Sequence, residues 1–285
     1  MIQIGVQQLM LSSLTGSDEA LLETLKRIKE YGFDSIELNS FMVHPSSFLV
    51  RALTKAAGMG VGKAGKRDWK NLVPQSGLKV ISLHSDLGSI ERDVEAVAKE
   101  ALEFGTDKVV ITGMYRYDYT SSSSLSSLSK RLSEGGKRLK ECGVSLLYHN
   151  HNIETVKDEK GRTALDVIIN ETDEEYVSFE LDTYWLSEAG CFLEEWMRKM
   201  GDRLKIWHIA DRGWRGSGKE IAPIVKSGSV ELGTGNLPLE RLLSIARELQ
   251  VQGIVLESHN NWINDDPMES IRISGQWLKK NILKS

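Results

Sequence analysis

The sequence predicts an α/β protein that folds as a single (β/α)₈ TIM barrel spanning residues 1–285. Eight apolar, β-rich segments alternate with amphipathic helical patterns along the chain, which is the order of a parallel sheet with crossover helices. A chain of 285 residues also has about the length that eight such units require. The alternative, a doubly wound open sheet, usually carries a glycine-rich phosphate-binding turn after its first strand. Here the first segment is followed by QQLMLSSLTG (7–16), which contains no GxGxxG pattern.

The predicted strands are short runs rich in valine, isoleucine, leucine and aromatic residues, which favour extended structure. They are IQIGVQ (2–7), FDSIEL (33–38), LKVISLH (78–84), KVVITG (108–113), VSLLYH (144–149), YVSFELD (176–182), LKIWHIA (204–210) and GIVLES (253–258).

The predicted helices have apolar residues at helical spacing and end signals that agree with their boundaries. DEALLETLKRIKEYG (18–32) has acids in its first turn and Gly32 at its end. Gly105 ends a second pattern in the same way, whereas Gly135 and Gly136 weaken a third. The predicted helices span 18–32, 91–105, 128–143, 192–201, 238–249 and 267–282.

Three stretches interrupt this alternation. Residues 58–77 are basic and glycine-rich, and we interpret them as an extra surface helix or turn near the N-terminal face, with a partner-binding surface as the alternative. Residues 115–129, YRYDYTSSSSLSSLS, are either a solvated loop or a mobile active-site loop. Residues 211–236 are too long for a plain connector, which indicates a functional loop after the seventh strand.

Composition and charge argue against several classes of protein. The net charge of −4 and the pI near 5.9 are unfavourable for a broad basic surface that binds nucleic acid. No apolar run approaches the roughly 18 residues of a membrane span, and the N-terminus lacks the features of a signal peptide. Cys142 and Cys191 have no metal or redox spacing. We therefore expect a cytoplasmic protein with neither a nucleic-acid nor a membrane partner.

Polar residues concentrate at the predicted C-terminal ends of the strands, where barrel enzymes place their chemistry. All six histidines fall there: His44, His84, His149, His151, His208 and His259. Four carboxylates do the same: Glu37, Glu180, Asp182 and Glu257. An acid at the end of a buried parallel strand is costly unless it is paired or binds a metal. The group indicates a metal site, and internal ion pairs without a metal are the alternative.

Strand periodicity selects the members of this site. Alternate residues of a barrel strand face the interior, so His149 and His151 share one face, with Asn150 turned towards the helices. One group from each of four strands gives the predicted metal ligands, which are His149, Asp182, His208 and Glu257. This mixed set suits Mn²⁺, Co²⁺, Fe²⁺ or Zn²⁺ better than Mg²⁺. The predicted catalytic proton carriers, or groups that support the ligands, are Glu180, His151 and Glu154.

Five blocks of the chain occur in the order found in one protein family. They are YHNHNIE (148–154), ELDTYWLSEAG (180–190), IWHIAD (206–211), ELGTGNLPLERLL (231–243) and VLESHNN (255–261). With these blocks, nearly the whole chain resembles the xylose isomerase-like barrels known as sugar phosphate isomerases/epimerases. The resemblance implies a divalent metal bound by Asp182, His208 and Glu257. The family's ligand at the end of strand five is usually a glutamate that also transfers protons, and His149 stands in its place, which makes a two-glutamate epimerase less expected.

The resemblance implies a metal-dependent isomerase or epimerase of a sugar or keto-sugar, which removes a proton next to a carbonyl through an enediolate. A dehydratase or lyase acting on a keto-sugar, keto-glycoside or inosose shares that intermediate and stays open. A non-catalytic sugar-binding barrel and a metal-dependent phosphodiesterase are less favoured. The expected cofactor is one divalent metal ion, Mn²⁺ first, with Zn²⁺, Co²⁺, Fe²⁺ and Mg²⁺ as alternatives. Barrels of this type often form homo-oligomers, although no feature of this sequence demonstrates one.

Three residues are candidates for contacts with the small-molecule carbohydrate substrate. His84 ends the third predicted strand, and Trp185 could stack on a sugar face, with core packing as the alternative. Lys219, together with Arg212 on the long loop after strand seven, could meet a phosphate or carboxylate, with a solvated surface role as the alternative.

Overall fold

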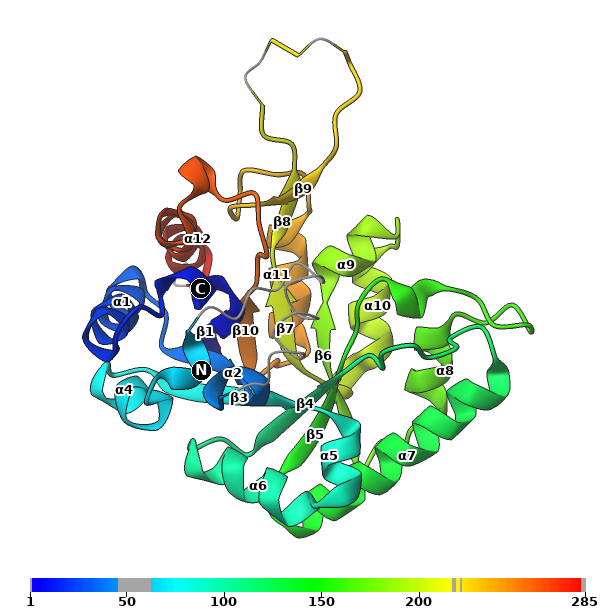
Figure 1. The fold of residues 1–285 in the computed structure, drawn as a ribbon. Helices are drawn as coiled ribbons and strands as arrows, with labels where there is room; N and C mark the ends of the chain where they lie inside the picture. The colour runs from blue at the N-terminus through cyan, green and yellow to red at the C-terminus, as the bar shows by residue number, and fades with distance from the viewer. Residues whose placement is uncertain (1, 46–62, 217–218, 221, 283–285) are drawn as a thin grey trace.

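Eight parallel strands close into a barrel surrounded by helices in the computed structural model, which describes residues 2–45, 63–216, 219–220 and 222–282 (Figure 1). The strands follow one another around the barrel in the order β1-β10-β7-β6-β5-β4-β3-β2. Each neighbouring pair is parallel, as in the pairs β5–β6 and β6–β7. The predicted single (β/α)₈ barrel is therefore confirmed.

The observed strands match the eight predicted ones to within two residues at either end. They are β1 (Gln3–Gln7), β2 (Ser35–Asn39), β3 (Lys79–Ser85), β4 (Lys108–Thr112), β5 (Ser145–His149), β6 (Val177–Asp182), β7 (Leu204–Ile209) and β10 (Gly253–Leu256). Two further short strands, β8 (Asp211–Gly213) and β9 (Gly228–Val230), pair antiparallel outside the barrel.

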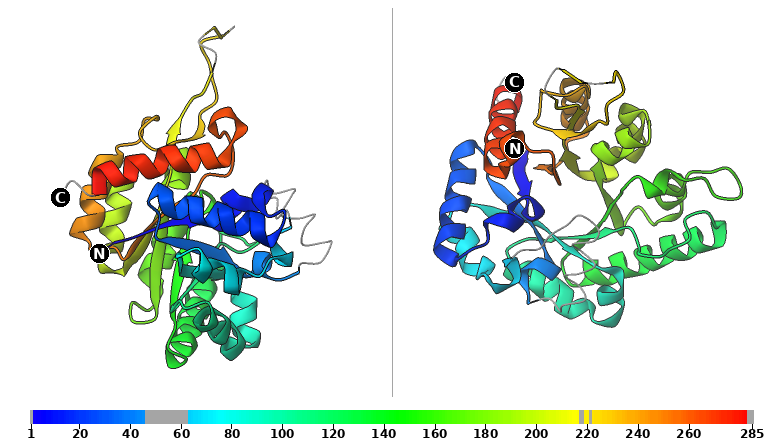
Figure 2. Two further views of the ribbon diagram at one scale, coloured as in Figure 1. Left: turned by 90° about the vertical axis from the view of Figure 1, so that its left-hand side faces the viewer. Right: turned by 45° about the horizontal axis from the view of Figure 1, so that its top comes forward.

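The helices form the outer layer, and the two views in Figure 2 show them around the strands. They are α1 (Asp18–Tyr31), α2 (Ser40–Val43), α4 (Trp69–Gln75), α5 (Leu87–Arg92), α6 (Val94–Glu103), α7 (Ser122–Glu141), α8 (Ala164–Glu171), α9 (Thr183–Glu188), α10 (Leu193–Met200), α11 (Leu239–Glu248) and α12 (Pro267–Ile282). Within the described residues, no helix combines the length and apolarity needed to cross a membrane.

Side-chain caps explain where several helices begin. Ser17 accepts a hydrogen bond from the amide of Ala20 at the start of α1, and Gly32 ends that helix in the left-handed conformation. Asp93 accepts a hydrogen bond from the amide of Ala96 and separates α5 from α6, so the helix predicted over 91–105 begins only at Val94.

The serine-rich stretch differs from its prediction as a loop. Ser121 caps α7 by accepting a hydrogen bond from the amide of Ser124, and the serines that follow form the first turns of that helix. Only the residues before Ser122 connect β4 to α7. Serine is a poor residue inside a helix but a good cap, and the buried Leu125 and Leu128 supply the packing that holds these turns against the barrel.

The basic stretch over 58–77 was predicted to be an extra surface helix or turn. Its residues 58–62 lie outside the described residues. The remainder contains α4, whose Trp69, Leu72 and Val73 are buried. This helix belongs to the layer that covers the barrel, next to α1 in Figure 1, and is not an addition to the surface.

The barrel interior has an apolar layer and a polar layer. The apolar layer is built from one inward residue on each of five strands: Ile81, Val110, Leu147, Ile206 and Val255. Two residues further along three of these strands come His149, His208 and Glu257, all buried. Because side chains alternate along a strand, this two-residue step keeps the polar groups inside the barrel and moves them to its C-terminal end.

Gly136 allows α7 to lie against the segment that precedes β6. A Cβ atom at this position would lie 2.2 Å from the carbonyl oxygen of Tyr176, which is backbone and cannot turn aside. We expect Gly136→Ala to destabilise the protein by about 1–3 kcal/mol, although alanine favours a helix over glycine by up to about 1 kcal/mol. Denaturant unfolding would measure the change. Gly16→Ala is the control, since its Cβ meets nothing within 4 Å; equal stabilities of the two variants would contradict this account.

Candidate metal centre

Strand register brings polar side chains of neighbouring strands side by side at the C-terminal end of the barrel. His149 on β5 lies opposite Glu180 on β6. Asp182, two residues beyond Glu180, lies opposite His208 on β7. Val255 on β10 is the partner of His208, which places Glu257 just beyond it. The register therefore gathers His149, Asp182 and His208 on their strands, and Glu257 directly follows β10.

Four side chains form an outer cluster of possible metal ligands. His149, Asp182, His208 and Glu257 each offer one ligand atom, these atoms lie within 4.8 Å of one another, and all four residues are buried. They are the four residues that the sequence predicted as ligands, one from each of four strands. Two imidazoles and two carboxylates from adjacent strands are a donor set suited to Mn²⁺, Zn²⁺, Co²⁺ or Fe²⁺.

The two imidazoles of the outer cluster are held as metal-binding histidines usually are. Nδ1 of His149 lies 2.8 Å from Oε1 of Glu180, which leaves Nε2 of His149 available for an ion. Nε2 of His208 lies 2.6 Å from Oε2 of Glu37, and its Nδ1 lies 2.8 Å from Oε2 of Glu257, a fellow member of the cluster. A carboxylate against the nitrogen that does not bind metal fixes the ring and its tautomer. The residues present therefore fit a divalent ion.

Asp182 is fixed by two further contacts. Its carboxylate accepts a hydrogen bond from the amide of Trp185 at 3.1 Å and so caps α9. The side chain of Asn150 bonds the main chain of Asp182 twice, at 3.0 and 3.1 Å. Asn150 was expected to face the helices, but it spans from the end of β5 to the end of β6 and ties the two ligand-bearing ends together.

Crowding of charge shifts the acid–base behaviour of the outer cluster. Burial, with the nearby Glu257, raises the pKa of Asp182 to about 6. Burial also opposes ionisation of Glu257, but His259 and His208 outweigh it and lower the pKa of Glu257. A bound cation favours the ionised form of both carboxylates. Without a cation, the neighbouring groups do not fully compensate the negative charges of the two carboxylates.

A second, deeper set of polar residues lies beneath the outer cluster. Glu37 on β2 has no exposed surface, and its Oε2 accepts a hydrogen bond from Nε2 of Gln7 at 3.0 Å. Ser82 donates its hydroxyl to the other oxygen of Glu37. The side-chain nitrogen Nδ2 of Asn39 donates to Oε1 of Gln7 at 2.8 Å. The sequence pointed to Glu37 as a strand-end acid but did not place it, Gln7, Asn39 or Ser82 in the site, and the irregular register between β2 and β3 is not visible in the sequence.

Glu180 belongs to this deeper set. It is fully buried, and its Oε1 lies 2.8 Å from Nδ1 of His149, 3.1 Å from Nε2 of His84 and 3.0 Å from Nε2 of His208. Burial opposes its ionisation, but His208 and His84 outweigh burial and hold the pKa of Glu180 well below its ordinary value. Burial lowers the pKa of His84, whereas Glu37 and Glu180 act more strongly and raise it to about 10. His84, predicted to contact substrate, lies in this buried set, with a side chain only 7% exposed.

Three aromatic rings border the outer cluster on the more open side. The ring of His151 lies 5.0 Å from that of His149 and 5.8 Å from that of Trp185, measured between centroids. His259 lies 5.7 Å from Trp185 on its other side. Burial, followed by the nearby His149, lowers the pKa of His151 to about 3, so its imidazole is neutral at neutral pH. The sequence placed His259 on this face but assigned it no role.

Glu154 is a buried residue on the loop that follows β5, and its side chain is hydrogen-bonded to two other residues of the protein. Its Oε1 accepts a hydrogen bond from the hydroxyl of Tyr148 at 2.7 Å, and its Oε2 accepts from the amide of His151 at 2.9 Å. Burial raises the pKa of Glu154, although these two hydrogen bonds oppose the rise. Both of its oxygens are thus engaged with the protein, which favours positioning His151 over carrying a proton itself.

The loop after β7 is organised by Asp211. Its carboxylate accepts hydrogen bonds from the amides of Arg212, Gly233, Gly235 and Leu237 at 2.8–3.0 Å. The G-x-G block noted in the sequence is therefore folded around a side chain of the protein itself. Backbone amides gathered in this way form a site for an anion, and here Asp211 fills it.

The predicted substrate contacts on this loop lie apart from the cluster. Arg212 pairs with Glu188 on α9. Lys219 is exposed in the connection between β8 and β9, which projects from the barrel in Figures 1 and 2. His44, the remaining histidine, pairs with Glu100 on α6 at 2.6 Å. The structure brings together five of the six histidines and leaves His44 outside.

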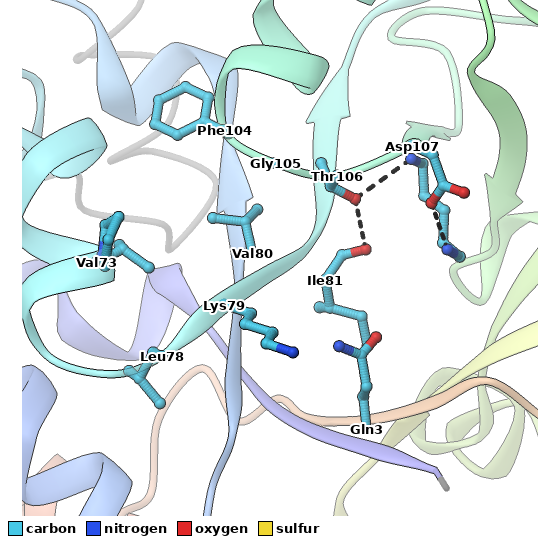
Figure 3. Close-up of a pocket in the computed structure, with 12 residues that line it drawn as sticks. Gln3, Val73, Leu78, Lys79, Val80, Ile81, Phe104, Gly105, Thr106 and Asp107 are labelled. Atoms are coloured by element: carbon cyan, nitrogen blue, oxygen red, sulfur yellow. Dashed lines mark hydrogen bonds and ion pairs between the residues drawn. The ribbon is translucent and has the colours of Figure 1, made fainter.

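A pocket of about 280 Å³ lies at the opposite, N-terminal end of the barrel (Figure 3). Gln3, Lys79, Thr106 and Lys108 contribute polar groups to its lining. It contains no member of the outer cluster. Because barrel enzymes work at the C-terminal end of the strands, we assign the chemistry to the polar cluster and not to this pocket.

Comparisons with known proteins agree with this architecture. The family described as xylose isomerase-like TIM barrel matches residues 25–281. A sugar phosphate isomerase/epimerase from Parabacteroides distasonis ATCC 8503 has a TM-score of 0.75 and 20% identity, over 98% of this chain and 93% of that chain. A probable 3-DHS dehydratase from Bacillus anthracis has a TM-score of 0.68 and 13% identity, over 98% and 99%. The IOLI protein with a bound zinc atom has a TM-score of 0.67 and 14% identity, over 99% of each chain.

No curated protein matches the sequence. At these identities the structural likeness shows the fold.

Proposed function

The chain belongs to the xylose isomerase-like TIM-barrel family, and from this premise we propose that it is a divalent-metal-dependent isomerase or epimerase of a sugar or keto-sugar. The outer cluster carries the proposal, because His149, Asp182, His208 and Glu257 place two imidazoles and two carboxylates at the end of the barrel where such enzymes act. The solved sugar phosphate isomerase/epimerase of the same fold is consistent with it.

We propose Mn²⁺ as the ion, with Zn²⁺, Co²⁺, Fe²⁺ and Mg²⁺ as alternatives. When bound, such an ion polarises a carbonyl and stabilises the negative charge that develops when a neighbouring carbon loses a proton. The protein's own contribution is to fix both imidazoles through Glu180 and Glu37 and to hold Asp182 through Asn150. Preorganised ligands of this kind need no rearrangement before the reaction.

Of the three predicted proton carriers, we propose His151 for this role. It lies at the more open side of the cluster beside Trp185, and its main chain is held by Glu154. A neutral imidazole in that place can accept a proton from a bound substrate. Glu154 bonds Tyr148 and His151, and Oε1 of Glu180 lies against three imidazoles, so we propose that they position His151 and the ligands. The indole nitrogen of Trp185 has no hydrogen-bond partner among the described residues and is a candidate donor to a sugar hydroxyl.

A dehydratase or lyase is the second candidate. The observation that favours it is His149, because an imidazole that binds metal cannot also be the proton-transferring glutamate of a two-base epimerase. A single base can then remove the proton next to the carbonyl while the neighbouring C–O bond breaks, and returning that proton to the departing oxygen releases it as water or an alcohol. The solved probable dehydratase of the same fold is consistent with this chemistry.

Proton exchange in deuterated water separates these proposals. We expect the metal-loaded protein to introduce deuterium next to the carbonyl of at least one keto-sugar in a panel, and His151→Gln to lower this exchange on the order of 10²–10⁴-fold while keeping its metal. Nuclear magnetic resonance of the products would show an epimer or isomer in one case and an unsaturated product in the other. His44→Gln is the matched control. Absence of exchange on every sugar, with metal bound, would favour a non-catalytic binding protein.

A further inference from the structure

The deeper polar set contains a second group of atoms arranged like metal ligands. Nε2 of His84 lies 3.0 Å from Oε2 of Glu37 and 3.1 Å from Oε1 of Glu180. Nε2 of His208 lies 2.6 Å and 3.0 Å from the same two oxygens. Two nitrogens and two oxygens thus alternate around one small volume. We call these four side chains the inner cluster; all are at most 7% exposed.

Both nitrogens of this set lack a hydrogen-bond partner. Among the described residues, Nε2 of His84 and Nε2 of His208 are buried and have none. Each of these nitrogens lies 2.6–3.1 Å from two carboxylate oxygens at once. Buried polar atoms nearly always find a partner, so close approach without hydrogen bonds indicates that the atoms surround a common point instead of pairing directly.

Charge gives an independent reason for a cation at this point. Glu37 and Glu180 are two fully buried carboxylates, and buried charges are stable only when they are paired or bind a metal. In the described residues no lysine or arginine pairs with either of them. The available positive partners are imidazoles, one of which, His208, also belongs to the outer cluster.

We propose that the inner cluster binds a second divalent cation through His84, His208, Glu37 and Glu180, so that His208 bridges two ions as an imidazolate whose remaining ring proton is released to solvent when the second ion binds. Nδ1 of His208 faces the outer cluster and its Nε2 faces the inner cluster, as a bridging imidazole requires. Two imidazoles and two carboxylates suit Zn²⁺, Co²⁺ or Mn²⁺. Nitrogen and oxygen ligands of zinc at about 2.0–2.1 Å lie roughly 3.3 Å apart in a tetrahedral site, so binding needs movements of only a few tenths of an ångström.

The inner ion has a structural task. Its two carboxylates, Glu37 and Glu180, have no exposed surface, so we assign this ion no contact with a substrate. It neutralises the two deep carboxylates and holds His208 in the orientation that the outer ion needs. The rival explanation is a proton in its place, with His84 or His208 as an imidazolium between the two carboxylates. The proposal concerns ligand atoms only and does not depend on which reaction the outer site performs.

Metal stoichiometry tests this directly. Tag-free full-length protein is stripped with a chelator, equilibrated with saturating Co²⁺ or Mn²⁺, freed of loose ions and measured by elemental analysis. We expect two ions per chain for the parent protein, one for His84→Gln and one for Glu37→Gln. His44→Gln, an exposed histidine outside both clusters, is the matched control and should retain two. Asp182→Asn should lose the outer ion and retain the inner one.

The outcomes separate this proposal from the proposed function. One ion in the parent protein, kept in His84→Gln and lost in Asp182→Asn, would overturn the inner site and leave the outer site standing. No ion in the parent protein would overturn both. Two ions that persist in both His84→Gln and Glu37→Gln would place the second ion elsewhere and would also overturn it. If these variants do not fold, anomalous diffraction from crystals of the Co²⁺-loaded parent decides, because the proposal requires two peaks that flank His208.

Discussion

Replacing Asp182 by asparagine is expected to abolish tight metal binding at the outer cluster, and with it the proposed activity. Removing a residue that only hydrogen-bonds a metal ligand typically weakens metal binding about 10- to 100-fold. Removing a charged ligand itself should weaken metal binding by more than this. Because metal polarisation contributes several kcal/mol to such reactions, kcat/KM should fall on the order of 10³-fold or more. Calorimetric titration with Mn²⁺ and the deuterium-exchange assay would measure the two effects.

The same substitution should leave the metal-free fold intact. Asparagine is as good a helix cap as aspartate, so α9 keeps its N-terminus. Burial and Glu257 raise the pKa of Asp182 to about 6, above its ordinary value, so ionised Asp182 costs stability as the pH rises through that region. In the presence of chelator at pH 8, we therefore expect Asp182→Asn to melt at the same temperature as the parent or higher. Asp202→Asn, at an exposed position, is the matched control, and a markedly lower melting temperature for Asp182→Asn alone would refute this account.

Glu180→Gln is expected to weaken metal binding without removing turnover at saturating metal. Glu180 lies against Nδ1 of His149 and Nε2 of His208, so its loss frees the orientation of both imidazoles. We expect metal affinity to fall about 10- to 100-fold and stability to fall by about 3–5 kcal/mol, the usual cost of breaking a buried pair. Titration of activity against Mn²⁺, together with denaturant unfolding, would measure both.

This experiment separates two roles for Glu180. If it positions the ligands, excess Mn²⁺ restores most of the activity of Glu180→Gln. If it carries a proton in the reaction, as the sequence suggested, kcat stays low at every metal concentration while metal affinity is unchanged. Glu174→Gln, at an exposed position on the segment leading into β6, should alter neither quantity.

The fold and the outer cluster could be predicted because both follow from local patterns. Short β-rich runs alternating with amphipathic helices specify parallel strands, and parallel strands in a barrel end at one rim. A polar residue that ends such a strand must therefore lie near the others, whatever the details of packing. His149, Asp182, His208 and Glu257 each lie within one residue of the end of a strand, so their meeting required only the correct alternation along each strand.

Helix boundaries at the serine-rich stretch depended on packing that the local pattern did not contain. Serines favour loops and caps when judged by themselves. Burial of Leu125 and Leu128 against the barrel is what makes Ser122 the beginning of α7. Most of the stability of a helix comes from tertiary packing of its apolar face, and that packing is not written in any short window of sequence.

The sequence alone determined the barrel, its rim and the residue types gathered there; the tertiary structure decided what each of them faces. Glu37 and His208 are 171 residues apart in the chain, yet their side-chain atoms lie 2.6 Å apart. Glu180 looked like a free proton carrier until three imidazoles were found around one of its oxygens. The direction and depth of a side chain inside a closed barrel depend on the stagger of all eight strands, and burial then sets its charge and its partners.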